Sequence, residues 1–105
     1  MKKSEKKILL IGWDAADWNL IRPLLKAGKM PALQGLMERG VSGNLSTMNP
    51  PYSPMLWTSV ATGKTPDKHG VLGFIEIDTE HQLVRPVTVN QRKSRALWNI
   101  FHQVG

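Results

Sequence analysis

A four-residue apolar run near the start of the chain, Ile8-Leu9-Leu10-Ile11, predicts a strand that is covered on both faces. The run lacks the alternation of a half-exposed strand, and continuous apolar strands are typical of parallel sheets packed between helices. Further along, helical patterns alternate with short strand-like segments. We therefore predict an α/β fold with a mainly parallel sheet flanked by helices.

The spacing of apolar residues and the signals at segment ends give the expected elements. Asp17 is expected to cap the first helix, Pro31 to open the second and Ser94 to cap the last. The expected helices span residues 17–27, 31–39, 53–62 and 94–104. The expected strands span residues 7–11, 41–47, 71–78 and 83–89. The last two strands are expected to pair, with Pro86 confining the final strand to an edge.

The chain has 105 residues, enough for one domain with a modest core, and it contains no cysteine. This excludes a disulfide scaffold, a thiolate zinc site, an iron–sulfur centre and a cysteine nucleophile. A hydrophobic content of 41% and a charged content of 21% are typical of a globular chain. We expect a basic tail over residues 1–6, followed by a domain that begins at residue 7 and reaches residue 105.

The net charge of +6 is partly concentrated at the start of the chain, where four lysines accompany one glutamate within seven residues. No aromatic side chain for base stacking lies among these lysines, so a solubilising terminus is a better interpretation than a nucleic-acid-binding arm. No apolar run approaches the roughly 20 residues that span a bilayer, and residues 8–11 are too few for a signal peptide. We expect no membrane span, no nucleic-acid partner and a cytoplasmic protein.

Asp14 follows the first predicted strand, after Gly12 and Trp13. In open α/β sheets, ligands bind in the crevice beyond the carboxyl ends of the strands. A carboxylate there supplies oxygen ligands and negative charge for a divalent cation. A turn or helix-capping residue is an equally good interpretation of Asp14 from its position alone, and Asp17 is the better candidate for the cap.

Ser53 lies in Pro50-Pro51-Tyr52-Ser53-Pro54, where a helix is predicted to start. Proline suits the first helical position, so Ser53 is expected at the cap, with its hydroxyl at the positive end of the helix. The backbone N–H groups of Met55 and Leu56 are then expected to bind phosphate. A hydroxyl nucleophile needs a base or a metal, and no histidine stands nearby, so a metal is the expected activator. An ordinary serine cap is the alternative.

Three segments together resemble one family: Ile8-Leu9-Leu10-Ile11-Gly12-Trp13-Asp14, Pro50-Pro51-Tyr52-Ser53-Pro54 and Ser59-Val60-Ala61-Thr62-Gly63-Lys64-Thr65-Pro66-Asp67-Lys68-His69-Gly70. They are similar to the alkaline phosphatase superfamily, and within it to the type I phosphodiesterase and nucleotide pyrophosphatase group. The resemblance extends over nearly the whole chain. It implies an alkaline-phosphatase-like fold, of which this chain would be the N-terminal portion.

The resemblance implies a metal-dependent phosphoric-ester hydrolase with two divalent metal ions, commonly zinc, and a phosphate ester as substrate. By this resemblance, Asp14 matches the metal-binding aspartate after the first strand. Ser53 matches the nucleophile, which also coordinates a metal and is transiently phosphorylated. His69 and Gly70 match a scaffold that shapes the site and binds no metal.

The chain also departs from the family pattern. Phe74 stands where nucleotide pyrophosphatases have an asparagine that helps to hold a phosphate oxygen, which leaves the substrate open. Asp14 and Ser53 are too few ligands to hold zinc, because catalytic sites use about three protein ligands. We therefore expect the remaining C-terminal part of the hydrolase domain as a partner, and an inactive chain without it.

Two alternatives stay open at this point. The first is a non-catalytic α/β module that binds phosphate or nucleic acid. The second is a cofactor-independent phosphoglycerate mutase, which uses the same combination of a metal-binding aspartate and a serine. A sulfatase fits poorly, because its nucleophile motif needs an arginine soon after the proline and Ser53-Pro54-Met55-Leu56 has none.

Overall fold

The computed structural model describes residues 7–104, so the expected basic tail over residues 1–6 lies outside the described residues. The chain divides between Asn44 and Leu45 into two compact units. The first unit contains α1 (Trp18–Lys26) and α2 (Pro31–Arg39). The second contains α3 (Ser53–Thr62), α4 (Pro66–His69), β1 (Ile75–Asp78), β2 (Leu83–Pro86), η1 (Val89–Gln91) and α5 (Leu97–Val104).

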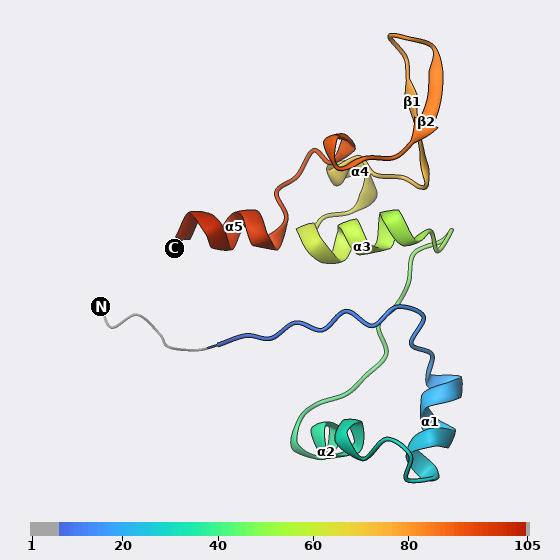
Figure 1. The fold of residues 1–105 in the computed structure, drawn as a ribbon, viewed down its shortest axis with the longest axis vertical. Helices are drawn as coiled ribbons and strands as arrows, with labels where there is room; N and C mark the ends of the chain where they lie inside the picture. The colour runs from blue at the N-terminus through green and yellow to red at the C-terminus, as the bar shows by residue number, and fades with distance from the viewer. Residues whose placement is uncertain (1–6, 105) are drawn as a thin grey trace. The chain divides into compact units, whose positions relative to one another are not determined.

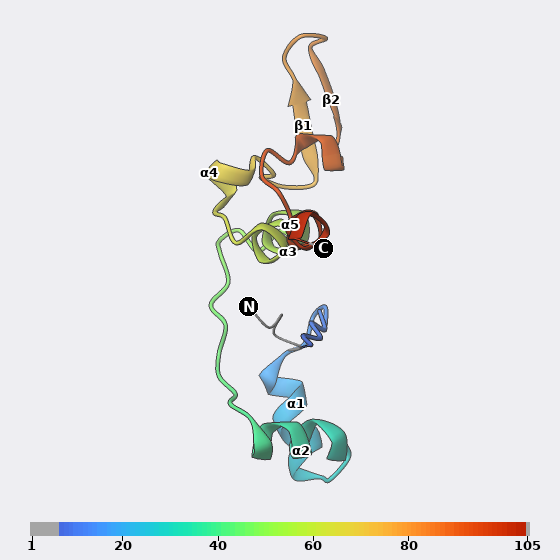
Figure 2. The ribbon, with the colours of Figure 1, turned by 90° about the vertical axis from the view of Figure 1, so that its left-hand side faces the viewer.

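The two helices of the first unit begin where the sequence predicts. The Asp17 carboxylate accepts a hydrogen bond from the Asn19 N–H at 2.8 Å and so caps α1. Pro31 is the first residue of α2, where its missing N–H removes no helical hydrogen bond. The helices contact each other and lie side by side in Figures 1 and 2. Both helix predictions are therefore confirmed.

The strand predicted over residues 7–11 is not formed. The segment runs unpaired toward α1 (Figure 1), and the Ile8 and Leu9 side chains are 82% and 84% exposed. The strand predicted over residues 41–47 is also missing. A strand is held by hydrogen bonds to a neighbouring strand, and residues 7–104 provide no neighbour for either segment. The mainly parallel sheet expected from these segments stays a prediction.

The sheet that is formed lies in the second unit and is an antiparallel hairpin. β1 pairs with β2 in a register that joins Ile75 to Pro86 and Asp78 to Leu83. Pro86 is the last residue of β2, in agreement with its expected position at an edge. Figure 2 shows the hairpin extending away from α3. The predicted pairing of these two segments is confirmed, over fewer residues than expected.

The core of the second unit is small and lies where α3, α4 and the segment before α5 meet. Its buried side chains are those of Met55, Thr62, His69, Val71 and Ala96, together with Glu76 of the hairpin. Gly63 and Gly70, with φ of 65° and 80°, end α3 and α4 in a left-handed conformation that suits glycine. In residues 7–104, no helix has the length and apolar character needed to cross a bilayer.

The capping residue of α5 differs from the prediction. The Ser94 hydroxyl donates a hydrogen bond to the Lys68 carbonyl oxygen at 3.2 Å and therefore does not cap the helix. The Asn99 side-chain oxygen instead accepts from the Ala96 N–H at 3.0 Å. Ser94 thus joins α4 to the segment before α5, which makes its hydroxyl a tertiary contact.

Candidate functional site

Ser53 is the first residue of α3, one position further into the helix than predicted. Tyr52 occupies the cap position, and Pro54 is the second helical residue. Proline fits there for the same reason as at the first position, because the N–H of either residue has no acceptor within the helix. Ser53 is exposed, so its hydroxyl is accessible at the positive end of α3.

The backbone donors near Ser53 are only partly those expected. The Leu56 N–H donates to the Tyr52 carbonyl oxygen at 3.0 Å, so it belongs to the helix and is not free to bind phosphate. Ser53 and Met55 lie in the first turn of α3. Their N–H groups have no carbonyl oxygen four residues earlier within the helix, so they have no helical hydrogen-bond partner. The N–H groups at the start of α3 that lack a helical acceptor are therefore those of Ser53, which is exposed, and Met55, which is buried.

Asp14 lies in a turn, where its carboxylate accepts a hydrogen bond from the Ala15 N–H at 3.1 Å. Ala15 has a φ of 53°, and the hydrogen bond from its own N–H to the preceding side chain helps to hold this strained conformation. The residue is exposed, so the carboxylate is accessible to a cation. Asp14 belongs to the first unit and Ser53 to the second, and their shared cation stays a prediction.

The supply of metal ligands is limited. Within residues 7–104, no three histidine, aspartate or glutamate side chains gather as a ligand set. Asp14 and Ser53 supply oxygen atoms, which divalent cations accept, but a catalytic zinc site uses about three protein ligands. A metal site that included both residues would therefore need further ligands to be complete.

His69 is fully buried and joins two parts of the second unit through its imidazole. Its Nδ1 atom accepts a hydrogen bond from the Val71 N–H at 3.1 Å. The proton of the neutral ring is therefore on Nε2, which donates to the Ser59 hydroxyl on α3 at 2.8 Å. Such an arrangement is what we expect of a scaffold residue. Sequence patterns do not single out Ser59, because nothing local distinguishes it from other helix serines.

Acid is expected to destabilise the second unit through His69. Burial lowers the pKa of this histidine, an effect that the Asp67 carboxylate partly offsets. The unfolded chain, with a histidine pKa of about 6.5, then binds a proton that the folded chain does not. The histidine's contribution to stability is therefore complete above about pH 6.5 and is lost as the pH falls through the lower, folded pKa.

Thermal unfolding of the purified protein between about pH 5 and 7, where histidine titrates, measures this effect. The midpoint should fall on acidification, and His69→Gln should flatten the dependence. His102→Gln is the matched control, because His102 is exposed on α5. An unchanged pH dependence in the His69→Gln variant would contradict this assignment.

Phe74, at the position of the expected asparagine, contacts the residue that precedes Ser53. Its ring lies edge-on to the Tyr52 ring, with 6.0 Å between centroids and 61° between planes. Both residues line a pocket of about 690 Å³, whose other walls include Leu72, Ile75 and Ile77. The phenyl ring offers no hydrogen bond to a phosphate oxygen. Most of the side chains that line this pocket beside Tyr52 are also apolar.

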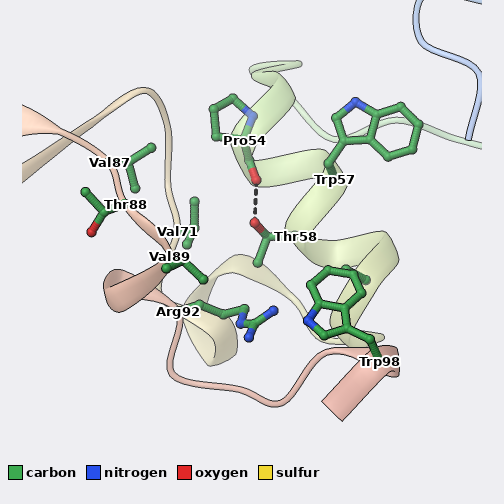
Figure 3. A pocket seen from close by; sticks show the side chains of 10 residues that line it. Pro54, Trp57, Thr58, Val71, Val87, Thr88, Val89, Arg92 and Trp98 are labelled. Carbon is green, nitrogen blue, oxygen red and sulfur yellow. Dashed lines mark hydrogen bonds between the residues drawn. The ribbon is translucent and has the colours of Figure 1, made fainter. Parts of the chain in front are cut away.

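A second pocket, of about 300 Å³, lies along α3 and contains no metal ligand. Figure 3 shows Trp57 and Trp98 on its wall, with the Arg92 side chain beside the Trp98 ring. The guanidinium carbon lies 5.3 Å from that ring's centroid. Neither Ser53 nor any carboxylate or imidazole is among the residues that line this pocket.

Comparison with known proteins links the chain to a family. The family model described as type I phosphodiesterase / nucleotide pyrophosphatase matches residues 8–102, nearly the whole chain. No curated protein and no solved structure matches the chain. The family match indicates a hydrolase of the phosphodiesterase or pyrophosphatase type. The chain therefore belongs to the type I phosphodiesterase / nucleotide pyrophosphatase family.

Proposed function

We propose that this chain forms part of a metal-dependent phosphoric-ester hydrolase in which Ser53 is the nucleophile. The observation that carries the proposal is the placement of Ser53 as the exposed first residue of α3. A helix N-terminus favours an anion, because its unpaired N–H groups and the helix dipole both act on negative charge. Membership of the family adds the reaction type.

The N–H groups of Ser53 and Met55 have the chemistry to bind a phosphoryl oxygen. In the proposed reaction, the Ser53 oxygen forms a bond to phosphorus while the bond to the leaving alcohol or phosphate oxygen breaks. The Ser53 proton passes to solvent as the oxygen attacks, and the leaving oxygen takes up a proton from solvent. Water then attacks phosphorus and breaks its bond to the Ser53 oxygen, which releases phosphate or its monoester and restores the hydroxyl. The helix donors stabilise the charge that develops on the oxygens of the phosphoryl group.

Two divalent cations, which we propose to be zinc, fit the oxygen atoms of Asp14 and Ser53 as part of their ligand set. Such cations supply Lewis-acid chemistry, favouring the serine alkoxide and offsetting charge on the phosphoryl group. Asp14, with its exposed carboxylate, would bind one cation together with the Ser53 oxygen. Because two ligands are too few, we propose that further ligands come from outside residues 7–104.

The apolar wall near Tyr52 and Phe74 bears on the substrate class. A nucleotide pyrophosphatase holds a phosphate oxygen with an asparagine, and Phe74 cannot make that hydrogen bond. We therefore propose a phosphate ester without assigning a nucleotide to it. The alternative, a phosphate- or nucleic-acid-binding module, is supported by the same helix N-terminus and by the net charge of +6.

One experiment separates the two functions. The protein purified from its source is assayed with bis(p-nitrophenyl) phosphate and p-nitrophenyl phosphate, before and after treatment with a metal chelator. The hydrolase proposal predicts that the chelator removes activity and that added zinc restores it. A protein that hydrolyses neither ester, and binds nucleic acid with an affinity that falls steeply as salt rises, would support the binding module instead.

A further inference from the structure

The imidazole of His69 lies at a junction of three segments in the second unit. The Nε2–H group reaches α3 through the Ser59 hydroxyl, at 2.8 Å. The Nδ1 atom holds the start of the next segment through the Val71 N–H, at 3.1 Å. The carbonyl oxygen of the same residue accepts from the Lys93 N–H, at 2.8 Å, in the segment before α5.

The turn that carries His69 has little freedom to move. The Lys68 carbonyl oxygen accepts from the Ser94 hydroxyl, which adds a second link to the segment before α5. A Cβ atom on Gly70 would come within 3.2 Å of the Gln91 carbonyl oxygen and of the Lys93 side chain. Gly70 also has a φ of 80°, which other residues rarely adopt. This close approach fixes the imidazole relative to the backbone of residues 91–94.

The bond to Ser59 therefore ties α3 to a rigid turn, and Ser53 is the first residue of the same helix. Ser59 lies in the second half of α3, and the buried Met55 anchors the first turn. A ten-residue helix moves as one body, because its backbone hydrogen bonds join each turn to the next. A shift of the helix at Ser59 would accordingly displace the hydroxyl of Ser53.

We propose that His69 is a positioning residue for the Ser53 nucleophile, acting through the Ser59 hydroxyl. This inference rests on the proposed function, in which Ser53 attacks phosphorus. His69 does not touch the substrate. Its Nε2 carries a proton and its Nδ1 already accepts from the Val71 N–H, so the ring has no free acceptor for the Ser53 proton. Its contribution is to hold α3 in the position that places the Ser53 hydroxyl at the right distance from the reacting phosphorus. A displacement of about 1 Å between reacting groups can lower a rate 100-fold.

Two substitutions at His69 separate its two side-chain hydrogen bonds. In His69→Asn, the amide oxygen can take the place of Nδ1 and accept from Val71, but the side chain is too short to reach Ser59. In His69→Gln, the longer amide can place its N–H near the position of Nε2 and donate to Ser59. Ser59→Ala removes the same bond from the other side and keeps a strong helix former in α3.

The measured quantity is the rate of phosphoserine formation per phosphorylatable site. The protein purified from its source is mixed with bis(p-nitrophenyl) phosphate, and the reaction is monitored by rapid quench. We expect His69→Asn and Ser59→Ala each to lower this rate by about tenfold or more, with KM nearly unchanged. The double variant should be no slower than either single variant, because both changes break one contact. His69→Gln should recover a large part of the rate.

The result that would overturn the inference is a normal rate per site in both His69→Asn and Ser59→Ala. A purely structural contribution of His69 would lower only the number of active sites and the thermal midpoint, and it would leave the rate at each site unchanged. Ser53→Ala is measured in parallel. If that variant still turns over, the proposed function fails. If it is inactive while the His69 and Ser59 variants are normal, only the positioning inference fails.

Discussion

Replacing Ser53 with alanine is expected to abolish the phosphoenzyme and to lower turnover by about 1,000-fold or more. The side-chain oxygen is the atom that forms the bond to phosphorus in the proposed reaction, and removal of a nucleophile leaves only the catalysis supplied by binding and charge stabilisation. The helix should persist, because alanine is the best helix former and Tyr52, not Ser53, occupies the cap position. The phosphoenzyme is measured by acid quench with a ³²P-labelled phosphate ester.

Two further variants make this result specific. Ser53→Thr keeps a hydroxyl at the first position of α3 and should retain the phosphoenzyme, at a reduced rate. Ser46→Ala is the matched control, since Ser46 is an exposed residue of the loop that precedes α3 and should leave turnover unchanged. Undiminished turnover in Ser53→Ala would remove Ser53 from the nucleophile position and, with it, the reaction proposed above.

Replacing Asp14 with asparagine is expected to weaken metal binding by about 100-fold or more. Mutation of a residue that only orients a metal ligand typically lowers metal affinity by about 10- to 100-fold. Mutation of a direct ligand should lower the affinity at least as much. The amide keeps the size and the oxygen atom that accepts from the Ala15 N–H, but it loses the negative charge. Metal content after dialysis, measured by mass spectrometry, and the zinc dependence of ester hydrolysis both report this change.

Asp17→Asn is the matched control for that experiment. Asp17 carries the same charge three residues away, but its carboxylate caps α1 through the Asn19 N–H, at 2.8 Å. Asparagine caps helices as well as aspartate does, so stability, metal content and rate should all stay near their original values. If Asp14→Asn and Asp17→Asn retain the same metal content and rate, Asp14 is a turn residue and not a ligand.

The helices of this chain could be predicted because their signals are local. The Asp17 carboxylate, Pro31 at a first helical position and Gly63 after a helix each act within one turn of the residues that they affect. Local rules also have limited precision at helix ends. Ser53 and Pro54 fit the first and second helical positions about as well as the cap and the first position, so the expected bounds 53–62 are confirmed while the cap is Tyr52 and not Ser53. This error also accounts for the wrong expectation at Leu56.

The hairpin strands follow each other closely in the chain and were also predictable, but the strands expected over residues 7–11 and 41–47 depend on partners elsewhere. The apolar run at residues 8–11 has the composition of a buried strand, yet it has no neighbour within residues 7–104. The contacts of Ser94 and Ser59 are likewise non-local, one joining Lys68 and the other His69. Such pairs are recognised only in the folded structure, and so is the packing of Phe74 against Tyr52.

The proposed function requires the Asp14 carboxylate and the Ser53 hydroxyl to bind the same cation. It is tested most directly by anomalous diffraction at the zinc absorption edge, on crystals of the protein purified from its source and supplied with zinc. We predict a zinc peak within about 2.0–2.2 Å of an Asp14 carboxylate oxygen and at a similar distance from the Ser53 oxygen. Zinc bound elsewhere, with these two oxygens coordinating no common ion, would contradict the account.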